Sequence, residues 1–329
     1  MNNYCIILAG GTGKRLWPVS TQQRPKQFID FFGAGLSLLQ MTFQRFQRIV
    51  PTDHIYVSTH ADYVDLVRQQ LPDIPADNIV AETLRLSTAP SAAKASQRIA
   101  ERDADACVVA SPADQLIVNE EGFCRDVESA FQRLRVTAGG QFMALAVQAT
   151  QPYTSYGYIQ RGEQLAQGLY RVKTFTEKPD REFAEIFVQS DEFLWNTGLF
   201  LWHVATMERL APEVLGEPMV QQLDGMLLDR HRDEVVVQEC KFGWTDVGCW
   251  PRMQEVSHKD VDGNAVLGSH RVLLEGCSGS TIAIDPGNAA IVKGLDGYLV
   301  AYHDHTLLIM PNDSDTDVKR LQTRLENQA

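Results

Sequence analysis

The sequence lacks the closely paired cysteines of zinc sites and of disulfide-stapled secreted proteins. It contains six cysteines, and none forms a C-x-x-C pair with another. This spacing argues against a structural zinc site and against a disulfide framework, and it favours a reducing compartment such as the cytoplasm. The six residues are Cys5, Cys107, Cys124, Cys240, Cys249 and Cys277.

Positive charge is also scarce. The chain has 30 Lys and Arg residues against 42 Asp and Glu residues, which gives a formal net charge of −12 at pH 7. Proteins that bind nucleic acids or membrane surfaces through electrostatics need a broad basic face. We therefore expect neither partner, and we expect any anion-binding site to be a local cluster of basic residues.

A long hydrophobic run is missing near the first strand. The apolar stretch Cys5–Ala9 is too short for a secretory signal or a membrane span, and no basic segment precedes it. We therefore expect a protein that is not exported. A low-complexity linker is missing as well, so the parts of the chain follow one another directly.

Short β-rich runs alternate with longer segments of helical periodicity. With 329 residues, 44% of them hydrophobic, the chain can form one large core and a small appended domain. The alternation predicts an α/β domain with a mostly parallel sheet, and Ser37 and Gln40 have the spacing of a helix capping box. The expected strands are Tyr4–Ala9, His54–Ser58, Ala106–Ala110 and Gln141–Val147, and the expected helices follow Ser37 and cover Ala61–Leu71, Ala89–Ala100 and Glu120–Val136.

The pattern changes after about residue 258. Short apolar runs separated by Gly, Asn and Asp predict a small all-β unit, and an amphipathic helix is expected at Asp315–Leu325. We therefore expect two domains, residues 1–258 and residues 259–329. The expected strands of the second are Val266–Leu267, Arg271–Leu274, Thr281–Ile284, Ala289–Val292, Tyr298–Tyr302 and Thr306–Met310.

A glycine-rich stretch, LAGGTGKRLWPVSTQQRPKQF at residues 8–28, follows the first expected strand. It is not a Walker A loop, because Leu8 stands where the first glycine belongs and Arg15 stands where Ser or Thr belongs. It is not a dinucleotide fingerprint either, because Leu16 replaces the third glycine. Two interpretations remain: a structural turn, or a loop whose backbone binds phosphate together with Arg15 and Lys26.

The complete string resembles the signature G-G-x-G-x-R-L-x-P, x-S, P-K of the sugar-1-phosphate nucleotidyltransferases. Five further landmarks follow in the order of that family, and the last two most resemble its mannose-1-phosphate guanylyltransferase branch. The resemblance extends over essentially the whole chain, as a short form without a fused isomerase domain. The landmarks are Ser111-Pro-Ala-Asp114, Tyr156-Gly-Tyr-Ile159, Phe175-Thr-Glu-Lys-Pro179, Trp195-Asn-Thr-Gly-Leu-Phe200 and Thr245-Asp-Val-Gly-Cys-Trp250.

This resemblance implies a Rossmann-like, GT-A-like fold, in which helices flank a mostly parallel sheet, with a small β-rich, β-helix-like C-terminal domain. It implies an enzyme that converts GTP and α-D-mannose 1-phosphate into GDP-mannose and pyrophosphate. The sugar phosphate would attack the α-phosphorus in line, without a covalent nucleophile. The family also leads us to expect a cytoplasmic homodimer.

The resemblance further implies roles for individual residues. Arg15 and Lys26 would hold the triphosphate, and Asp114 and Asp246 would bind Mg²⁺. Together with Lys178 these four are the expected catalytic residues. The expected sugar-phosphate contacts are Gly157, Glu177, Lys178 and Asn196, and the expected nucleotide contacts are Leu8, Ala9, Gly10, Gly11, Gly13, Glu82, Ser87 and Thr88.

Three positions depart from the family pattern. Leu86 and Ser87 stand where Arg and Asn are usual, and Gln115 stands where many guanylyltransferases have His. Two alternatives therefore stay open. One is an enzyme of the same fold that uses another sugar 1-phosphate or another nucleoside triphosphate, and the other is a non-catalytic nucleotide-sugar sensor.

Three remaining features have ordinary structural interpretations. Trp17 either stacks on a base or packs beneath the glycine turn. The His303-Asp-His305 segment favours an exposed β-turn over a metal site, because no third ligand is in view. The Gly276–Gly279 segment is followed by Ser280, where a nucleophile elbow needs its closing glycine, so hydrolase chemistry is not expected.

Overall fold

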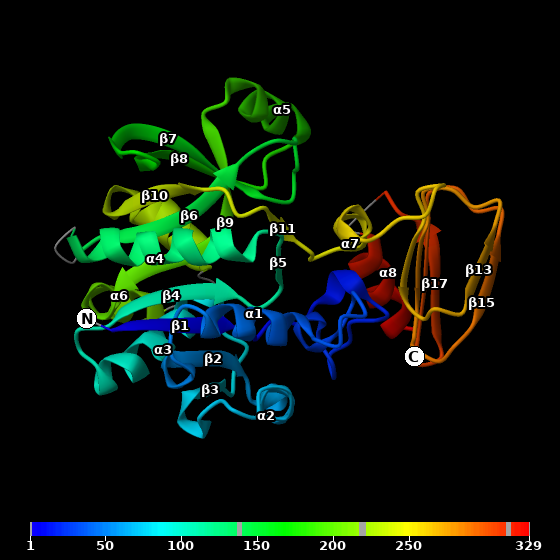
Figure 1. Cartoon of the computed structure of the whole chain (residues 1–329), viewed down its shortest axis with the longest axis horizontal. Helices are drawn as coiled ribbons and strands as arrows, with labels where there is room; N and C mark the ends of the chain where they lie inside the picture. The colour runs from blue at the N-terminus through cyan, green and yellow to red at the C-terminus, as the bar shows by residue number, and fades with distance from the viewer. Residues whose placement is uncertain (1, 137–139, 217–221, 314–316, 329) are drawn as a thin grey trace. The chain divides into compact units, whose positions relative to one another are not determined.

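The computed structural model describes residues 2–136, 140–216, 222–313 and 317–328, and Figure 1 traces them along the chain. Contacts within the chain group it into two compact units. The first comprises Met1–Gly10, Thr42–Ala113 and Ile117–Trp244, and the second comprises Gly11–Met41, Asp114–Leu116 and Thr245–Ala329. This grouping differs from a single cut in the sequence, and the domain boundary at residue 258 stays a prediction.

A nine-stranded sheet forms the centre of the first unit. From edge to edge its strands are β3 (Ile79–Glu82), β2 (Ile55–His60), β1 (Asn3–Leu8), β4 (Cys107–Pro112), β9 (Phe193–His203), β6 (Phe142–Gln148), β10 (Val235–Cys240), β8 (Leu169–Glu177) and β7 (Gly157–Ala166). Strands β3, β2, β1 and β4 run parallel, so the carboxyl ends of β1, β3 and β4 lie at the same edge of the sheet. Ligand-binding loops gather at this edge in open α/β folds.

Strand β9 interrupts the parallel order. It pairs antiparallel with both β4 and β6, and its register with β6 shifts between Leu145 and Ala146. Its apolar residues, such as Leu199, Phe200 and Leu201, are buried, and helices packed on the sheet contact the strand. Strand β8 also pairs antiparallel with both β10 and β7, so the sheet is mixed and more antiparallel than the sequence predicts.

Helices cover the sheet because each has an apolar stripe. In α3 (Thr88–Arg102) and α6 (Val204–Gly216), small and aliphatic residues such as Ala92, Ile99 and Met207 are buried in one cluster with the sheet. Helix α4 (Glu120–Val136) packs Phe123 against Phe46 of α1 (Leu38–Gln47). The unit also contains α2 (Val64–Gln70), α5 (Arg181–Ser190), the π-helix η6 (Gly225–Arg230) and short 3₁₀ helices.

The predicted capping box and two of the predicted helices are present in the structure. Ser37 Oγ accepts a hydrogen bond from Gln40 N at 3.2 Å, and Gln40 Oε1 accepts one from Ser37 N at 2.9 Å, which is the predicted capping box. The bounds of α4 agree with the expected Glu120–Val136. Helix α3 begins one residue earlier and ends two residues later than expected.

The second unit contains two small sheets. Strands β12 (Ala265–Gly268), β14 (Thr281–Ile284), β16 (Tyr298–His303) and β17 (Thr306–Pro311) form one, and β13 (Val272–Glu275) and β15 (Ala290–Lys293) form the other. From β12 to β16, the strands alternate between the two sheets along the chain. Within each sheet, β12–β14, β14–β16 and β13–β15 pair in parallel, as in the turns of a β-helix. Ile282, Ile284 and Val300 are buried in its interior.

Two helices complete the second unit, α7 (Trp250–Val256) and α8 (Asp317–Glu326). Val318 of α8 is buried in the same apolar cluster as Leu16 and Trp250. The expected terminal helix is therefore present, although its expected first residue, Asp315, lies outside the described residues.

The turn between β16 and β17 contains Asp304 and His305, with φ of 40° and 62°. Two adjacent residues with positive φ are typical of a tight hairpin turn. The expected β-turn at His303-Asp-His305 is thus confirmed. Among the described residues, no helix combines the length and apolar character needed to span a membrane.

A buried hydrogen bond fastens α3 to β9, and it yields a test of this packing. Trp202 Nε1 donates to Ser96 Oγ at 2.9 Å, and neither residue is exposed. We predict that Ser96→Ala costs about 1–3 kcal/mol of unfolding free energy, because it leaves the indole N–H buried and unpaired. Chemical denaturation measures this cost.

A double-mutant cycle with Trp202→Phe separates the bond from general packing. The double variant should lose less than the sum of the single losses, by more than about 0.5 kcal/mol. Trp202→Phe combined with Ser190→Ala, at the end of α5, should be additive. Additivity in the first pair would contradict the predicted role of this bond.

Candidate active site

The glycine-rich loop of the second unit is shaped by Gly13. This residue has φ of 63° and precedes the short 3₁₀ helix η1 (Lys14–Leu16). A Cβ at this position would lie 2.3 Å from Ser20 Oγ and 3.0 Å from Lys26 Cγ. Gly13 is therefore required both for the turn and for the close approach of Lys26. Gln27 Nε2 donates to Gly11 O at 2.9 Å, which holds the loop against the Lys26 segment.

Lys26 is the centre of a charged cluster. Its Nζ lies 2.6 Å from Asp114 Oδ2 and 3.9 Å from Asp246 Oδ1. Asp114 precedes β5 (Gln115–Ile117) and Asp246 ends β11 (Trp244–Asp246), and these two short strands pair with each other. The pairing brings together two carboxylates that are far apart in the sequence.

Only 8% of Lys26 is exposed. Burial alone would lower its pKa, but the charges of Asp114 and Asp246 outweigh burial and raise the pKa above its ordinary value. Lys26 is therefore a permanent cation at neutral pH. Its charge is held in place by carboxylates that keep about a quarter of their own surface exposed.

Arg15 lies on the other side of Asp246. Its Nη2 is 3.8 Å from Asp246 Oδ2. A Cβ at Gly248 would lie 2.8 Å from Arg15 Nη2 and 2.9 Å from both oxygens of Asp246, so glycine leaves the room that this pair occupies. The sequence analysis did not assign Gly248, although its place in the Asp246-Val-Gly motif was a usable signal.

Trp17 packs beneath the loop. Its carbonyl oxygen accepts a hydrogen bond from Trp250 Nε1 at 3.1 Å, and its side chain lies against the buried cluster of Leu16 and Trp250. Of the two interpretations open for Trp17, the structure supports packing under the turn.

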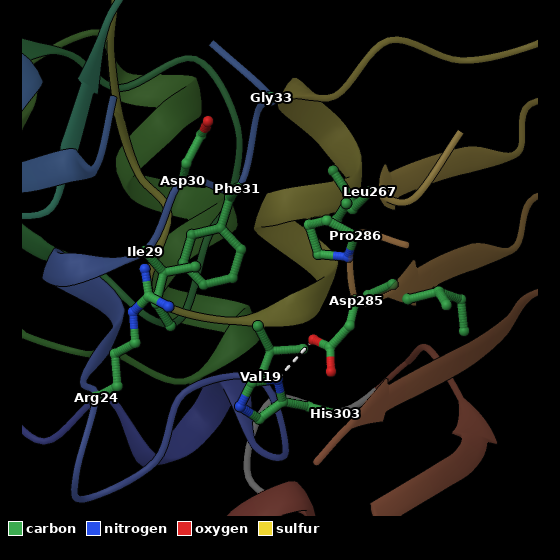
Figure 2. Close-up of a pocket in the computed structure, with 13 residues that line it drawn as sticks. Val19, Arg24, Ile29, Asp30, Phe31, Gly33, Leu267, Asp285, Pro286 and His303 are labelled. Atoms are coloured by element: carbon green, nitrogen blue, oxygen red, sulfur yellow. Dashed lines mark hydrogen bonds and ion pairs between the residues drawn. The ribbon is translucent and has the colours of Figure 1, made fainter. Parts of the chain in front are cut away.

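A pocket of about 200 Å³ lies within the second unit, and Val19, Arg24 and Ile29 form part of its wall (Figure 2). His303 Nδ1 and Asp285 Oδ1 are 2.6 Å apart in its wall. Its other walls are mainly apolar, and the described residues that line it do not include Lys26 or its two aspartates. The labelled lining residues are Val19, Arg24, Ile29, Asp30, Phe31, Gly33, Leu267, Asp285, Pro286 and His303.

The first unit carries the remaining expected nucleotide residues. At the end of β1, Ala9 N donates to Ser58 O at 2.8 Å and Ala113 N donates to Leu8 O at 3.1 Å, which fixes the backbone before Gly10. At the end of β3, the buried Glu82 accepts a hydrogen bond from Ser58 Oγ at 3.0 Å. The parallel strands therefore bring Leu8–Gly10 and Glu82 to one edge.

The loop after β3 holds Arg85, for which the sequence offered no partner. Its Nη1 donates to Tyr63 Oη at 3.1 Å, and its guanidinium carbon lies 5.4 Å from the centre of the Tyr63 ring. Asp62 is 3.6 Å from Arg85 Nη2. Arg85 is thus engaged by the η4 segment Ala61–Tyr63.

Ser87 and Thr88 open α3. The carbonyl oxygen of Ser87 accepts hydrogen bonds from Ser91 N at 3.2 Å and Ser91 Oγ at 3.0 Å. The hydroxyl of Thr88 bonds to Leu223 N at 2.8 Å and to Gln222 Oε1 at 3.1 Å. The Thr88 side chain is therefore directed to another part of the first unit.

The expected sugar-phosphate residues lie on neighbouring strands. Gly157 pairs with Glu177 across β7 and β8, and a Cβ on Gly157 would lie 2.7 Å from Glu177 Oε2. Strand β7 also pairs antiparallel with β9, where Tyr158, next to Gly157, is opposite Trp195, next to Asn196. The sequence landmarks thus converge on one end of these strands.

The backbone turns sharply at Lys178, which has φ of 48° and donates its N–H to Tyr156 O at 3.2 Å. Lys178 Nζ pairs with the neighbouring Glu177 carboxylate. Burial raises the pKa of Glu177, Lys178 lowers it, and the nearby carboxylates of Asp224 and Asp229 raise it further, so the net shift is upward. Asn196 is buried and accepts a hydrogen bond from Gly198 N at 3.0 Å.

An aromatic group that the sequence analysis did not assign lies next to these residues. Trp195 stacks on Tyr153 with ring centres 5.2 Å apart, and Tyr156 contacts both Trp195 and Trp244. Each of these aromatics adjoins a motif in sequence, which was the available signal. The group forms an apolar aromatic surface beside Gly157 and Asn196.

Comparison with known proteins identifies the family of this chain. The family model described as Nucleotidyl transferase matches residues 4–263. The chain is 31% identical to the mannose-1-phosphate guanylyltransferase RfbM of Salmonella typhimurium, over 91% of this chain and 69% of the relative. It is 30% identical to the alginate biosynthesis protein AlgA of Pseudomonas putida, over 98% of this chain and 71% of the relative.

This chain belongs to the nucleotidyl transferase family. The expected family and enzyme class are thereby confirmed. A crystal structure described as a mannose-1-phosphate geranyltransferase from Thermus thermophilus matches with a TM-score of 0.87 and 28% identity, over 99% of this chain and 100% of that one. The expected nucleotidyltransferase fold with a β-rich C-terminal region is confirmed by this likeness.

The loop of this nucleotidyl transferase can be tested at Gly13. We predict that Gly13→Ala costs more unfolding free energy than Gly33→Ala, measured by chemical denaturation. Both glycines have positive φ, of 63° and 65°, so each substitution carries a backbone cost of about 1 kcal/mol. Only at Gly13 must Ser20 and Lys26 also move, because no atom lies within 4 Å of a Cβ at Gly33.

Equal costs at the two positions would contradict the close approach of Lys26 to Gly13. The same measurement on Gly248→Ala extends the test, because its φ is not positive and only the contacts with Arg15 and Asp246 oppose the methyl group.

Proposed function

We propose that this nucleotidyl transferase converts GTP and α-D-mannose 1-phosphate into GDP-mannose and pyrophosphate. The observation that carries the proposal is the buried Lys26, held at 2.6 Å from Asp114 and 3.9 Å from Asp246 beside the glycine loop. The names of its relatives from Salmonella and other bacteria support the choice of substrates.

The reaction is a single displacement at phosphorus. A phosphate oxygen of the sugar 1-phosphate forms a bond to the α-phosphorus of GTP, and the bond from that phosphorus to the pyrophosphate oxygen breaks. Pyrophosphate leaves with the electron pair. Because both reactants are polyanions, the protein has to align them and neutralise the charge that develops on the leaving group.

Lys26 and Arg15 suit the neutralising role. Lys26 keeps its proton at neutral pH, because the charges of Asp114 and Asp246 raise its pKa more than burial lowers it. Arg15 offers guanidinium donors that match phosphate oxygens, and a third of its side chain is exposed. We assign both to the triphosphate and to the departing pyrophosphate.

Asp114 and Asp246 fit a hard divalent cation. Mg²⁺ is usually held by one or two carboxylates together with substrate phosphates, and these two carboxylates converge on one point at Lys26. When bound by Asp114 and Asp246, Mg²⁺ would act as a Lewis acid and lower the effective charge of the substrate phosphates. The alignment of the two carboxylates is the contribution of this chain.

The sugar phosphate is assigned to the first unit. Glu177 and Asn196 present a carboxylate and an amide, which suit the hydroxyl groups of a hexose, and Gly157 allows close backbone approach. Lys178 is 58% exposed at its side chain and supplies a cation for the sugar phosphate group. These roles follow the family pattern and agree with the pairing of β7, β8 and β9.

The nucleotide is assigned to the loop and to the edge of the sheet. We assign the backbone of Leu8, Ala9, Gly10, Gly11 and Gly13 to the nucleotide, together with Glu82 and Ser87. Because the chain departs from the family pattern at Leu86, Ser87 and Gln115, an alternative nucleoside triphosphate or sugar phosphate is a second candidate. We also propose that the enzyme acts as a homodimer in the cytoplasm.

A substrate panel tests the function. We predict that purified protein with Mg²⁺ releases pyrophosphate fastest from GTP and mannose 1-phosphate, when four nucleoside triphosphates are combined with several sugar phosphates. Faster turnover of another pair would replace the proposed substrates. No turnover with any pair would favour the non-catalytic sensor.

A second experiment tests the role of Asp246. Asp246→Asn should lower kcat by a factor of about 10² or more, because a charged ligand of the proposed metal ion is lost while the shape of the side chain is kept. The exposed Asp73→Asn serves as a matched control and should keep wild-type turnover. A wild-type kcat in Asp246→Asn would contradict the assignment of Asp246 to the metal site.

A further inference from the structure

The Thr88 hydroxyl joins the start of α3 to the segment that leads into η6. Leu223 N donates to Thr88 Oγ1 at 2.8 Å, and Thr88 Oγ1 donates to Gln222 Oε1 at 3.1 Å. A hydroxyl has one proton to donate and two lone pairs to accept with. The single proton of Thr88 and one of its lone pairs are therefore used within the first unit.

The segment held by Thr88 is anchored on one side and charged on the other. Leu223 and Met226 are buried in the core shared with α3, which fixes the entry into η6. Asp224 accepts a hydrogen bond from Gly225 N at 3.0 Å, and Asp229 follows one turn later. Isolated π-helical turns occur frequently at functional sites.

Helix η6 packs beside β8, the strand that ends in Glu177. Asp224 and Asp229 are close enough to act on the Glu177 carboxyl through their charge, and both raise its pKa. The cation next to Glu177 is Lys178, which lowers the pKa of Glu177, and Arg232 lowers the pKa of Asp229. The charge around Glu177 therefore depends on where the η6 segment is held.

We propose that Thr88 is a positioning residue for the sugar-phosphate side of the site: its hydroxyl holds the η6 segment, with Asp224 and Asp229, against Glu177. The proposal rests on the proposed function, in which Glu177 binds the sugar. It reassigns Thr88, because the sequence placed this residue among the nucleotide contacts. The two hydrogen bonds join Thr88 to Gln222 and Leu223, at the entry to the η6 segment that lies beside β8.

The test separates the two substrates kinetically. Thr88→Val keeps the shape of the side chain and removes both hydrogen bonds, whereas Thr88→Ser keeps the hydroxyl. In Thr88→Val, the KM for mannose 1-phosphate should rise by about tenfold, as expected for the loss of the two hydrogen bonds that hold the η6 segment. The KM for GTP should stay within about twofold of the wild-type value, and Thr88→Ser should restore the KM for mannose 1-phosphate.

The pH dependence supplies a readout that general destabilisation would not move. When the η6 segment is released, the carboxylates of Asp224 and Asp229 act less on Glu177, so its pKa falls toward the ordinary value. The acidic limb of kcat/KM for mannose 1-phosphate should then move to lower pH in Thr88→Val. Asp229→Asn should move it in the same direction without touching Thr88.

The opposite pattern overturns the proposal. A rise in the KM for GTP with an unchanged KM for mannose 1-phosphate would make Thr88 a nucleotide contact. Unchanged KM values for both substrates would show that the η6 segment keeps its position without the Thr88 hydroxyl. If Thr88→Val does not fold, Gln222→Leu removes one of the two bonds from the other side and should raise the KM for mannose 1-phosphate in the same selective way.

Calorimetry keeps this result distinct from a failure of the proposed function. Titration of mannose 1-phosphate into wild type, Thr88→Val and Thr88→Ser measures Kd without turnover. Weaker binding in Thr88→Val alone supports the positioning role even if GTP is not the nucleotide. Equal binding in all three proteins contradicts it.

Discussion

The proposed site depends on one buried cation. Lys26 is 8% exposed, and a charge at that depth is costly unless it is paired. Asp114 and Asp246 supply the pairing, and Gly13 leaves the space that the lysine stem occupies. In a chain with a net charge of −12, this buried positive group is held in place by the chain's own carboxylates. The glycine loop, the β5–β11 pair and Arg15 are all arranged around this contact.

Much of the fold was predictable because it is encoded locally. The capping box at Ser37 and Gln40, the apolar stripe of α4 and the short runs of the β-rich segment each specify one element without reference to the rest of the chain. The charged residues of the site were predictable for a different reason. Arg15, Lys26 and Asp246 stand in motifs whose order resembles one family.

The rest was not predictable because it depends on contacts between distant segments. Nothing in the composition of Phe193–His203 shows that this strand enters the sheet antiparallel between β4 and β6. The role of Gly248 appears only when Arg15 and Asp246 are placed beside it. In the same way, the Thr88 hydroxyl was assigned to the nucleotide by its place in a motif, whereas its partners Gln222 and Leu223 are more than a hundred residues away.

The central claim is that the carboxylates held by Lys26 bind the metal that the reaction uses. The most direct measurement is the Mg²⁺ concentration that gives half-maximal pyrophosphate release, in wild type and in Asp114→Asn. The account predicts a shift to higher Mg²⁺ in the variant, tenfold for each loss of about 1.4 kcal/mol in binding free energy. An unchanged Mg²⁺ dependence in Asp114→Asn would contradict the account.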